Sequence, residues 1–208
     1  MRNFIYVVMC LTAIGCSDDE DIDSDEAARR AYLALDGSIE KSIALGFAGF
    51  NAASSANIDP QMGTGTSAGT ITITGKVDSG SSANKGMRLE IGMVDYDDGK
   101  VAYNDDNDMV HVIFNTSTDL TLQPSFDLQL KNFPNGTLEG TLTAGDLMNG
   151  VYVLSGDLEG ELTLNLTVMG TTMAGAVAGD VVRVPGATTI TGTATNSDGG
   201  VYNISITI

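Results

Sequence analysis

The 208-residue sequence predicts a mainly β protein with one N-terminal α-helix, in which a curved antiparallel β-meander, a half-barrel or barrel, packs on the helix. From Gly69 onward, apolar and polar residues alternate, as in antiparallel strands with one wet face. Turn pairs such as Asp98-Gly99 and Asn149-Gly150 separate the alternating segments. One long stretch, residues 27–53, has the helical period. Length and pattern together indicate a single folded domain, residues 27–208.

The first fifteen residues have the parts of a secretory signal peptide. Arg2 is followed by an apolar run from Phe4 to Ile14 and by the small residue Gly15. This run is shorter than the roughly 20 apolar residues that a bilayer-spanning helix needs. Residues 1–15 are therefore predicted to be removed rather than to span a membrane.

The segment Leu11-Thr12-Ala13-Ile14-Gly15-Cys16 resembles the lipobox of bacterial lipoproteins, although Ala13 stands where that family most often has leucine. The resemblance implies cleavage before Cys16, a diacylglyceryl thioether on its sulfur and a further acyl chain, such as palmitate, on its new amine. Ser17 resembles the residues that let lipoproteins proceed to the outer membrane. The expected location is the outer membrane, facing either the periplasm or the cell surface. Cys10 lies in the signal, so the mature chain is expected to have no disulfide.

An acidic segment follows the cysteine. Seven of the ten residues from Ser17 to Glu26 are Asp or Glu, and little in the segment can be buried. Residues 16–26 are therefore predicted to be an extended, disordered tether. The segment also resembles the acidic surface-export signals of some Gram-negative lipoproteins. The net charge of −17 argues against nucleic-acid partners and against docking on anionic lipid.

The helix is predicted over residues 27–53, with acidic residues before and in its first turn. Glycines from Gly46 to Gly49 predict a bend or fraying near its end. Residues 54–68 are small or turn-forming and are predicted to be a loop that leads into the sheet, residues 69–208. The apolar stripe of the helix is expected to consist of Ala28, Tyr32, Leu35, Ile39, Ile43, Phe47 and Phe50.

An internal repeat marks the β region. The residues of 136–144, GTLEGTLTA, recur as GDLEGELTL at 156–164, and a weaker copy begins at Gly175. The spacing favours a meander that grows by adding hairpins. Four central glycines share the parity of the apolar residues and are expected to let the sheet curve around the helix: Gly140, Gly160, Gly179 and Gly192.

The sequence offers no convincing catalytic set, and we expect no enzymatic activity. His111 is the one histidine, its parity places it on the solvent side, and no Gly-x-Ser-x-Gly elbow is present. A thiol nucleophile and a zinc site are improbable without a free cysteine in the mature chain.

Two acidic loops are candidates for a weak calcium site, because Ca²⁺ takes six to eight oxygen ligands. Their spacing does not match an EF-hand, so solvated turns are the alternative. No other cofactor is expected. The candidate ligands are Asp95, Asp97, Asp98, Asp105, Asp106 and Asp108.

These features predict an outer-membrane-anchored lipoprotein that acts as a non-catalytic binding or structural module of the cell envelope. Its partners would be the membrane, through the lipid on Cys16, and an envelope protein. The alternative is a carrier of lipid or another hydrophobic ligand, held between the helix and the curved sheet. Methionines could line the carrier's cavity: Met87, Met93, Met109, Met148, Met169 and Met173.

Overall fold

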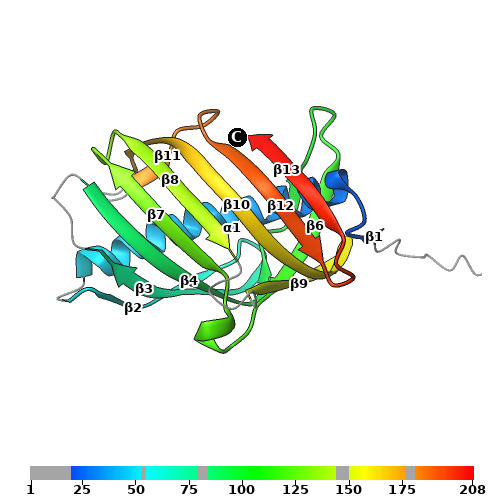
Figure 1. Cartoon of the computed structure of the whole chain (residues 1–208), viewed down its shortest axis with the longest axis horizontal. Helices are drawn as coiled ribbons and strands as arrows, with labels where there is room; N and C mark the ends of the chain where they lie inside the picture. The colour runs from blue at the N-terminus through cyan, green and yellow to red at the C-terminus, as the bar shows by residue number, and fades with distance from the viewer. Residues whose placement is uncertain (1–19, 53–54, 79–83, 144–149, 177–180) are drawn as a thin grey trace, which may run out of the picture.

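A computed structural model describes residues 20–52, 55–78, 84–143, 150–176 and 181–208 (Figure 1). The signal segment, Cys16 and the first part of the expected tether lie outside these ranges. The elements in chain order are β1 (Glu20–Asp21), α1 (Asp25–Ala52), β2 (Asn57–Thr64), β3 (Ala68–Val77), β4 (Asn84–Asp97), β5 (Lys100–Ala102), β6 (Met109–Asn115), the 3₁₀ helix η1 (Leu120–Leu122), β7 (Ser125–Lys131), β8 (Thr137–Thr143), β9 (Val151–Gly156), β10 (Leu158–Ala174), β11 (Val181–Arg183), β12 (Thr189–Asn196) and β13 (Val201–Thr207).

The fold class predicted from the sequence is confirmed: the chain is mainly antiparallel β, with one helix near its N-terminus packed against a curved sheet. The helix begins two residues earlier than predicted, because Ser24 caps it. The Ser24 Oγ accepts a hydrogen bond from the amide of Ala27 at 3.1 Å, and Asp25 and Glu26 fill the first turn. Within the described ranges, no helix has both the length and the hydropathy to cross a membrane.

The prediction of a disordered tether is wrong for residues 20–26, which belong to the folded domain. β1 pairs in parallel with the start of β10, Glu20 opposite Leu158 and Asp21 opposite Glu159. Ile22, the one apolar residue of the acidic segment, is only 2% exposed. The acidic composition of the segment could not predict this structure, because the strand that β1 pairs with, β10, lies far away in the sequence.

The loop predicted over residues 54–68 is also wrong in part, because β2 forms an edge strand there. It pairs antiparallel with β3, and its register shifts between Ile58 and Gln61. Ile58 is buried against the helix, whereas most of β2 is exposed or half-buried. One buried residue leaves little alternation for a sequence pattern to detect.

The sheet is more than a simple meander. The strands follow one another in the order β2-β3-β4-β7-β8-β10-β9-β6-β5, with β12 and then β13 on the other edge of β10. Neighbours in sequence do form hairpins, such as β3–β4, β7–β8 and β12–β13. However, β4 lies beside β7, and β6 lies beside β9, so the expectation of growth by successive hairpins is only partly correct.

Two long strands organise the sheet. β4 pairs with β7 over its first half and with β6 at its end, where Tyr96 lies opposite Phe114. β10 pairs with β9 near its start and with β8 farther along. The six strands β4, β7, β8, β10, β9 and β6 therefore form a closed circuit of pairings. The segment between β6 and β7 lies along β4 where the partner of β4 changes from β7 to β6. Thr116 exchanges hydrogen bonds with the backbone of Met93, and the carbonyl of Pro124 accepts from the amide of Ile91.

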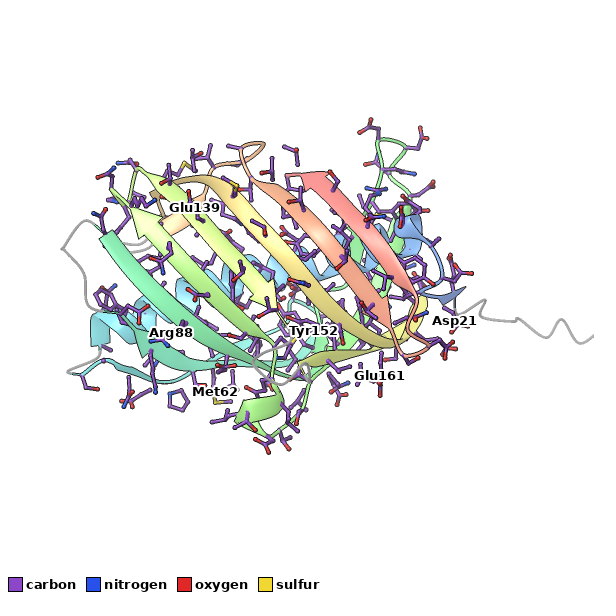
Figure 2. All side chains as sticks on the ribbon, in the orientation of Figure 1. Asp21, Met62, Arg88, Glu139, Tyr152 and Glu161 are labelled. Atoms are coloured by element: carbon purple, nitrogen blue, oxygen red, sulfur yellow. The ribbon has the colours of Figure 1, made fainter. Side chains whose placement is uncertain are left out.

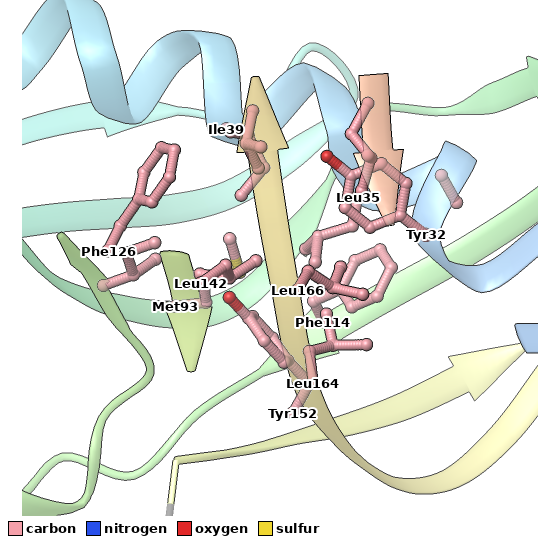
Figure 3. Close-up of a cluster of buried hydrophobic side chains, with 14 of the residues drawn as sticks. Tyr32, Leu35, Ile39, Met93, Phe114, Phe126, Leu142, Tyr152, Leu164 and Leu166 are labelled. Carbon is pink, nitrogen blue, oxygen red and sulfur yellow. The ribbon is translucent and has the colours of Figure 1, made fainter. Parts of the chain in front are cut away.

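The helix lies on the inner face of the sheet and contacts β2 and β3 near one edge and β13 at the other. Its predicted stripe is buried as expected, from Ala28 through Phe47, while Phe50 is partly buried. The inward residues of the strands meet this stripe and form one continuous core (Figure 3). The alternation read from the sequence therefore assigned the two faces of the sheet correctly.

Of the four glycines that were predicted to let the sheet curve around the helix, Gly140 and Gly160 lie in different surroundings. Gly140 does face the core, where a Cβ would lie 2.8 Å from the ring of Phe126. Gly160 instead has a φ of +107° and open space around it, so it is a surface bend and not a contact with the helix. Gly179 lies outside the described residues.

Candidate functional site

The acidic loops do not bring the six candidate calcium ligands together. Asp95 exchanges hydrogen bonds with Asn115, whereas Asp97 accepts from the amide of Gly99. In a separate turn, the side chain of Asn104 donates to the Asp108 carboxylate and accepts from the Asp108 amide, and the same turn carries the exposed Asp105 and Asp106. Among the residues with described structure, no group of three or more His, Cys, Asp or Glu side chains is placed to hold a metal. Calcium binding here stays a prediction.

Asp98 belongs to a polar cluster between the helix and the sheet. Its carboxylate accepts hydrogen bonds from Tyr96 Oη at 2.6 Å, from Thr66 and from Lys41 Nζ. Burial alone would raise the pKa of Asp98, but these donors outweigh it and lower the pKa below its ordinary value. Burial, together with Asp98, raises the pKa of Tyr96. The cluster connects the helix to the sheet.

Lys41 completes this cluster from the helix side. Its Nζ donates to Tyr96 Oη at 2.8 Å and to the carbonyl of Thr64 at 2.7 Å, and it lies 5.0 Å from the centre of the Tyr96 ring. One ammonium group thereby joins α1 to β2 and β4. Sequence reasoning missed this role, because the partners lie 23 to 57 residues away.

His111 lies at the rim, as its parity predicted, and is about one-third exposed. Its Nε2 is 2.9 Å from Asp97 Oδ1, and its backbone exchanges hydrogen bonds with Asp157. A His–Asp pair of this kind orients a base in hydrolases, but the base also needs a nucleophile within hydrogen-bond reach. The hydrogen bonds of His111 that the structure shows run to the carboxylates of Asp97 and Asp157 and to the Asp157 amide, and they connect β6 to its neighbouring turns.

Arg183 forms a second cluster that sequence reasoning missed. Its guanidinium donates to both carboxylate oxygens of Asp36, at 2.9 and 2.8 Å, and to Glu40 at 2.6 Å. The Arg183 side chain is 10% exposed. Asp36 and Glu40 are four residues apart on the helix and therefore share a face, which is the only local signal of the cluster. The ion pairs fix β11 to the helix.

The interior offers less room for a ligand than the carrier hypothesis expected. Five large side chains of the helix are at most 1% exposed: Tyr32, Leu35, Ile39, Ile43 and Phe47. Figure 3 shows Tyr32, Leu35 and Ile39 among buried side chains of the sheet. Of the six methionines, only Met87 and Met93 are buried. Met109, Met169 and Met173 are exposed, and Met148 lies outside the described residues.

Five buried side-chain polar atoms of the described residues have no hydrogen-bond partner, and the Tyr152 hydroxyl is one of them. The hydroxyl of Tyr152 is buried and has no hydrogen-bond partner within the described ranges, and its ring packs edge-on against Phe114 at 6.2 Å. Burial raises the pKa of this hydroxyl, so it is neutral at physiological pH.

The outer face of the sheet carries a hollow that sequence reasoning also missed. Its volume is about 940 Å³, and η1 forms one wall beside β2, β3, β4, β7 and β8. The lining carries charges of both signs and several threonines beside two apolar residues: Lys76, Arg88, Glu90, Asp127, Ile58 and Leu120. A second hollow of about 500 Å³ shares Asp127 and Thr141 with it and continues toward β10. The alternation of the sequence predicted polar residues on the outer face of the sheet. It could not predict the hollow, because the hollow depends on where the segment with η1 lies over the sheet.

Comparison of the chain with protein-family models, with curated proteins and with solved structures finds no match.

Proposed function

We propose that this chain is an outer-membrane lipoprotein, acylated on Cys16, whose folded part is a non-catalytic binding or structural module of the cell envelope. One observation carries the proposal: the apolar face of the sheet is occupied by the chain's own helix, with five large side chains at most 1% exposed. A partner therefore binds on the outside. The hollow on the outer sheet face carries both signs of charge and therefore suits a partner that brings charged or polar groups.

The anchor is tested by mass spectrometry of the mature chain purified from membranes. The expected N-terminal peptide starts at Cys16 and carries a diacylglyceryl group and an amide-linked acyl chain. A matched Cys16→Ser variant should lose both the lipid mass and the membrane association. A mature chain that starts elsewhere, or that lacks lipid, would remove the basis of the proposal.

The second candidate is a carrier of a hydrophobic ligand, and the buried hydroxyl of Tyr152 favours it. A buried polar group usually has a hydrogen-bond partner, and a ligand head group could supply one. If the protein is a carrier, lipid that copurifies with the wild type should be reduced in Tyr152→Phe, which keeps the ring and removes only the hydroxyl. An equal, near-zero lipid content in both proteins would leave the first proposal standing.

A further inference from the structure

The segment nearest to Cys16 is fixed to one end of the domain. The Glu20 amide donates to the carbonyl of Asp157 at 3.1 Å, and Asn196 Nδ2 donates to the carbonyl of Ile22 at 2.9 Å. Arg30 Nη2 lies 2.6 Å from both carboxylate oxygens of Glu20. With Ile22 buried as well, the chain is attached to the fold from Glu20 onward.

This attachment limits the distance between the domain and an acyl group on Cys16. Four Cα-to-Cα steps separate Cys16 from Glu20 and span at most about 14 Å in any conformation. A disordered tether ending at Glu26 would have reached much farther and left the domain free to turn. Because this distance is short, the end of the domain that contains β1 must lie nearest to the acyl chains.

That end is built from two turns and the start of the helix, which contact β1 or the residues that follow it. They are the turn between β9 and β10 at Asp157, the turn between β12 and β13 from Asn196 to Gly200, and the start of the helix after Ser24. Figure 1 shows these segments together at one end of the long axis, and Figure 2 places Asp21 there, with Arg88 toward the other end.

The same end is strongly acidic. Its exposed carboxylates are Asp21, Asp23, Asp157, Glu159 and Asp198. Arg29 and Arg30 lie nearby, but they are paired with Glu26 and Glu20. The Debye length in physiological salt is about 8 Å, so those carboxylates that come within about this distance of the bilayer sense the charge of its surface. These carboxylates disfavour anionic headgroups and are compatible with zwitterionic ones.

We propose that β1, these two turns and the start of the helix form the membrane-facing end of the domain, held close to the zwitterionic headgroup surface that carries the acyl chains of Cys16. The inference rests on the proposed acylation of Cys16. It makes the opposite end, with the β7–β8 turn, the part that points away from the membrane.

The orientation is tested by energy transfer on vesicles. Acylation consumes the Cys16 thiol and removal of the signal discards Cys10, so one introduced cysteine is the only free thiol in the mature chain. The acylated variants Ser197→Cys, in the β12–β13 turn, and Asn135→Cys, in the β7–β8 turn, are labelled with a donor dye. They are then reconstituted in phosphatidylcholine vesicles that contain an acceptor lipid.

Transfer from position 197 should exceed that from position 135 at least about two-fold, since a 28-residue helix of about 42 Å runs along the molecule. A 30-residue Gly/Ser insertion between Asp19 and Glu20 adds about 30 Å of flexible reach and should reduce the difference. Equal or reversed transfer without the insertion would overturn the orientation.

Intact mass and vesicle flotation of the same samples separate the two proposals. A chain without acyl groups on Cys16 would overturn the proposed function and this inference with it. An acylated chain that floats with the vesicles but gives equal transfer at the two positions would overturn the orientation alone.

Discussion

Single side chains show how the helix is held on the sheet. Asp98 was expected to be a calcium ligand, but its carboxylate accepts hydrogen bonds from Tyr96 and Thr66 and pairs with Lys41. The sequence predicted that Asp98 lies at a turn. It could not show the partners, because Lys41 lies 57 residues earlier and reaches Asp98 only after the sheet has curved.

Asp98 should make the stability of the protein depend on acidic pH. Its pKa is lowered in the folded state, so the stabilisation is fully present above the unfolded pKa of about 3.9 and is lost as the pH falls through the lower folded value. Unfolding by urea, followed between pH 6 and pH 3, should show a steeper loss of unfolding free energy below pH 4 for the wild type than for Asp98→Asn. Identical slopes in the two proteins would contradict this role.

The Arg183 cluster should contribute more to stability than a surface ion pair of similar geometry. Arg183→Met leaves Asp36 and Glu40 without their cation in a mostly buried place and should lower the unfolding free energy by about 3 kcal/mol. Arg88 and Asp78 form a matched control, at 2.6 Å but with side chains 53% and 40% exposed. Arg88→Met should cost about 0.5 kcal/mol or less in the same urea titration. Equal costs would show that burial of the Arg183 cluster is unimportant.

At the scale of elements, the periodicity of the sequence predicted which residues of a strand face the core. The inward residues of β4, β6 and β7 were assigned correctly, because alternation between two faces is a property of each strand alone. β1 and β2 were missed because their support comes from elsewhere: β1 from β10, more than 130 residues later, and β2 from the helix and β3. The order of strands around β4 and β10 has no local signature either.

The glycines near the end of the helix allow close packing and do not interrupt it. The helix continues to Ala52, and a Cβ on Gly49 would lie 2.4 Å from Ile58 Cγ2. Gly49→Ala should therefore destabilise the protein by about 1–3 kcal/mol through overpacking, although alanine is the better helix former. In a double-mutant cycle with Ile58→Ala, the two changes should be coupled, because truncating Ile58 removes the clash. Stabilisation by Gly49→Ala in the wild-type background would contradict the packing.

The attachment of β1 should be visible in hydrogen exchange. The Glu20 amide is bonded to Asp157 and should exchange slowly in the wild type. Ile22→Ala removes the buried side chain that holds this segment and should speed exchange in residues 20–24. Val201→Ala, at a position 60% exposed, is the control and should leave those amides unchanged. Fast exchange at Glu20 in the wild type would mean that the acidic segment is free after all.

At the scale of the whole molecule, the fold class followed from the sequence, while the candidate site followed only in part. The absence of a catalytic motif and the lipobox resemblance are properties of short segments and could be read directly. The outer hollow arises where η1 and five strands meet, and the filling of the interior depends on how side chains from distant segments pack together. Such features need the packed structure.

Native mass spectrometry of Ser17–Ile208, exported to the bacterial periplasm without its anchor and combined with lipid extraction, tests the central claim most directly. Because the helix fills the apolar face of the sheet, the account predicts a single mass equal to that of the polypeptide. Lipid or another apolar compound bound at a fixed stoichiometry would contradict it and would make the protein a carrier.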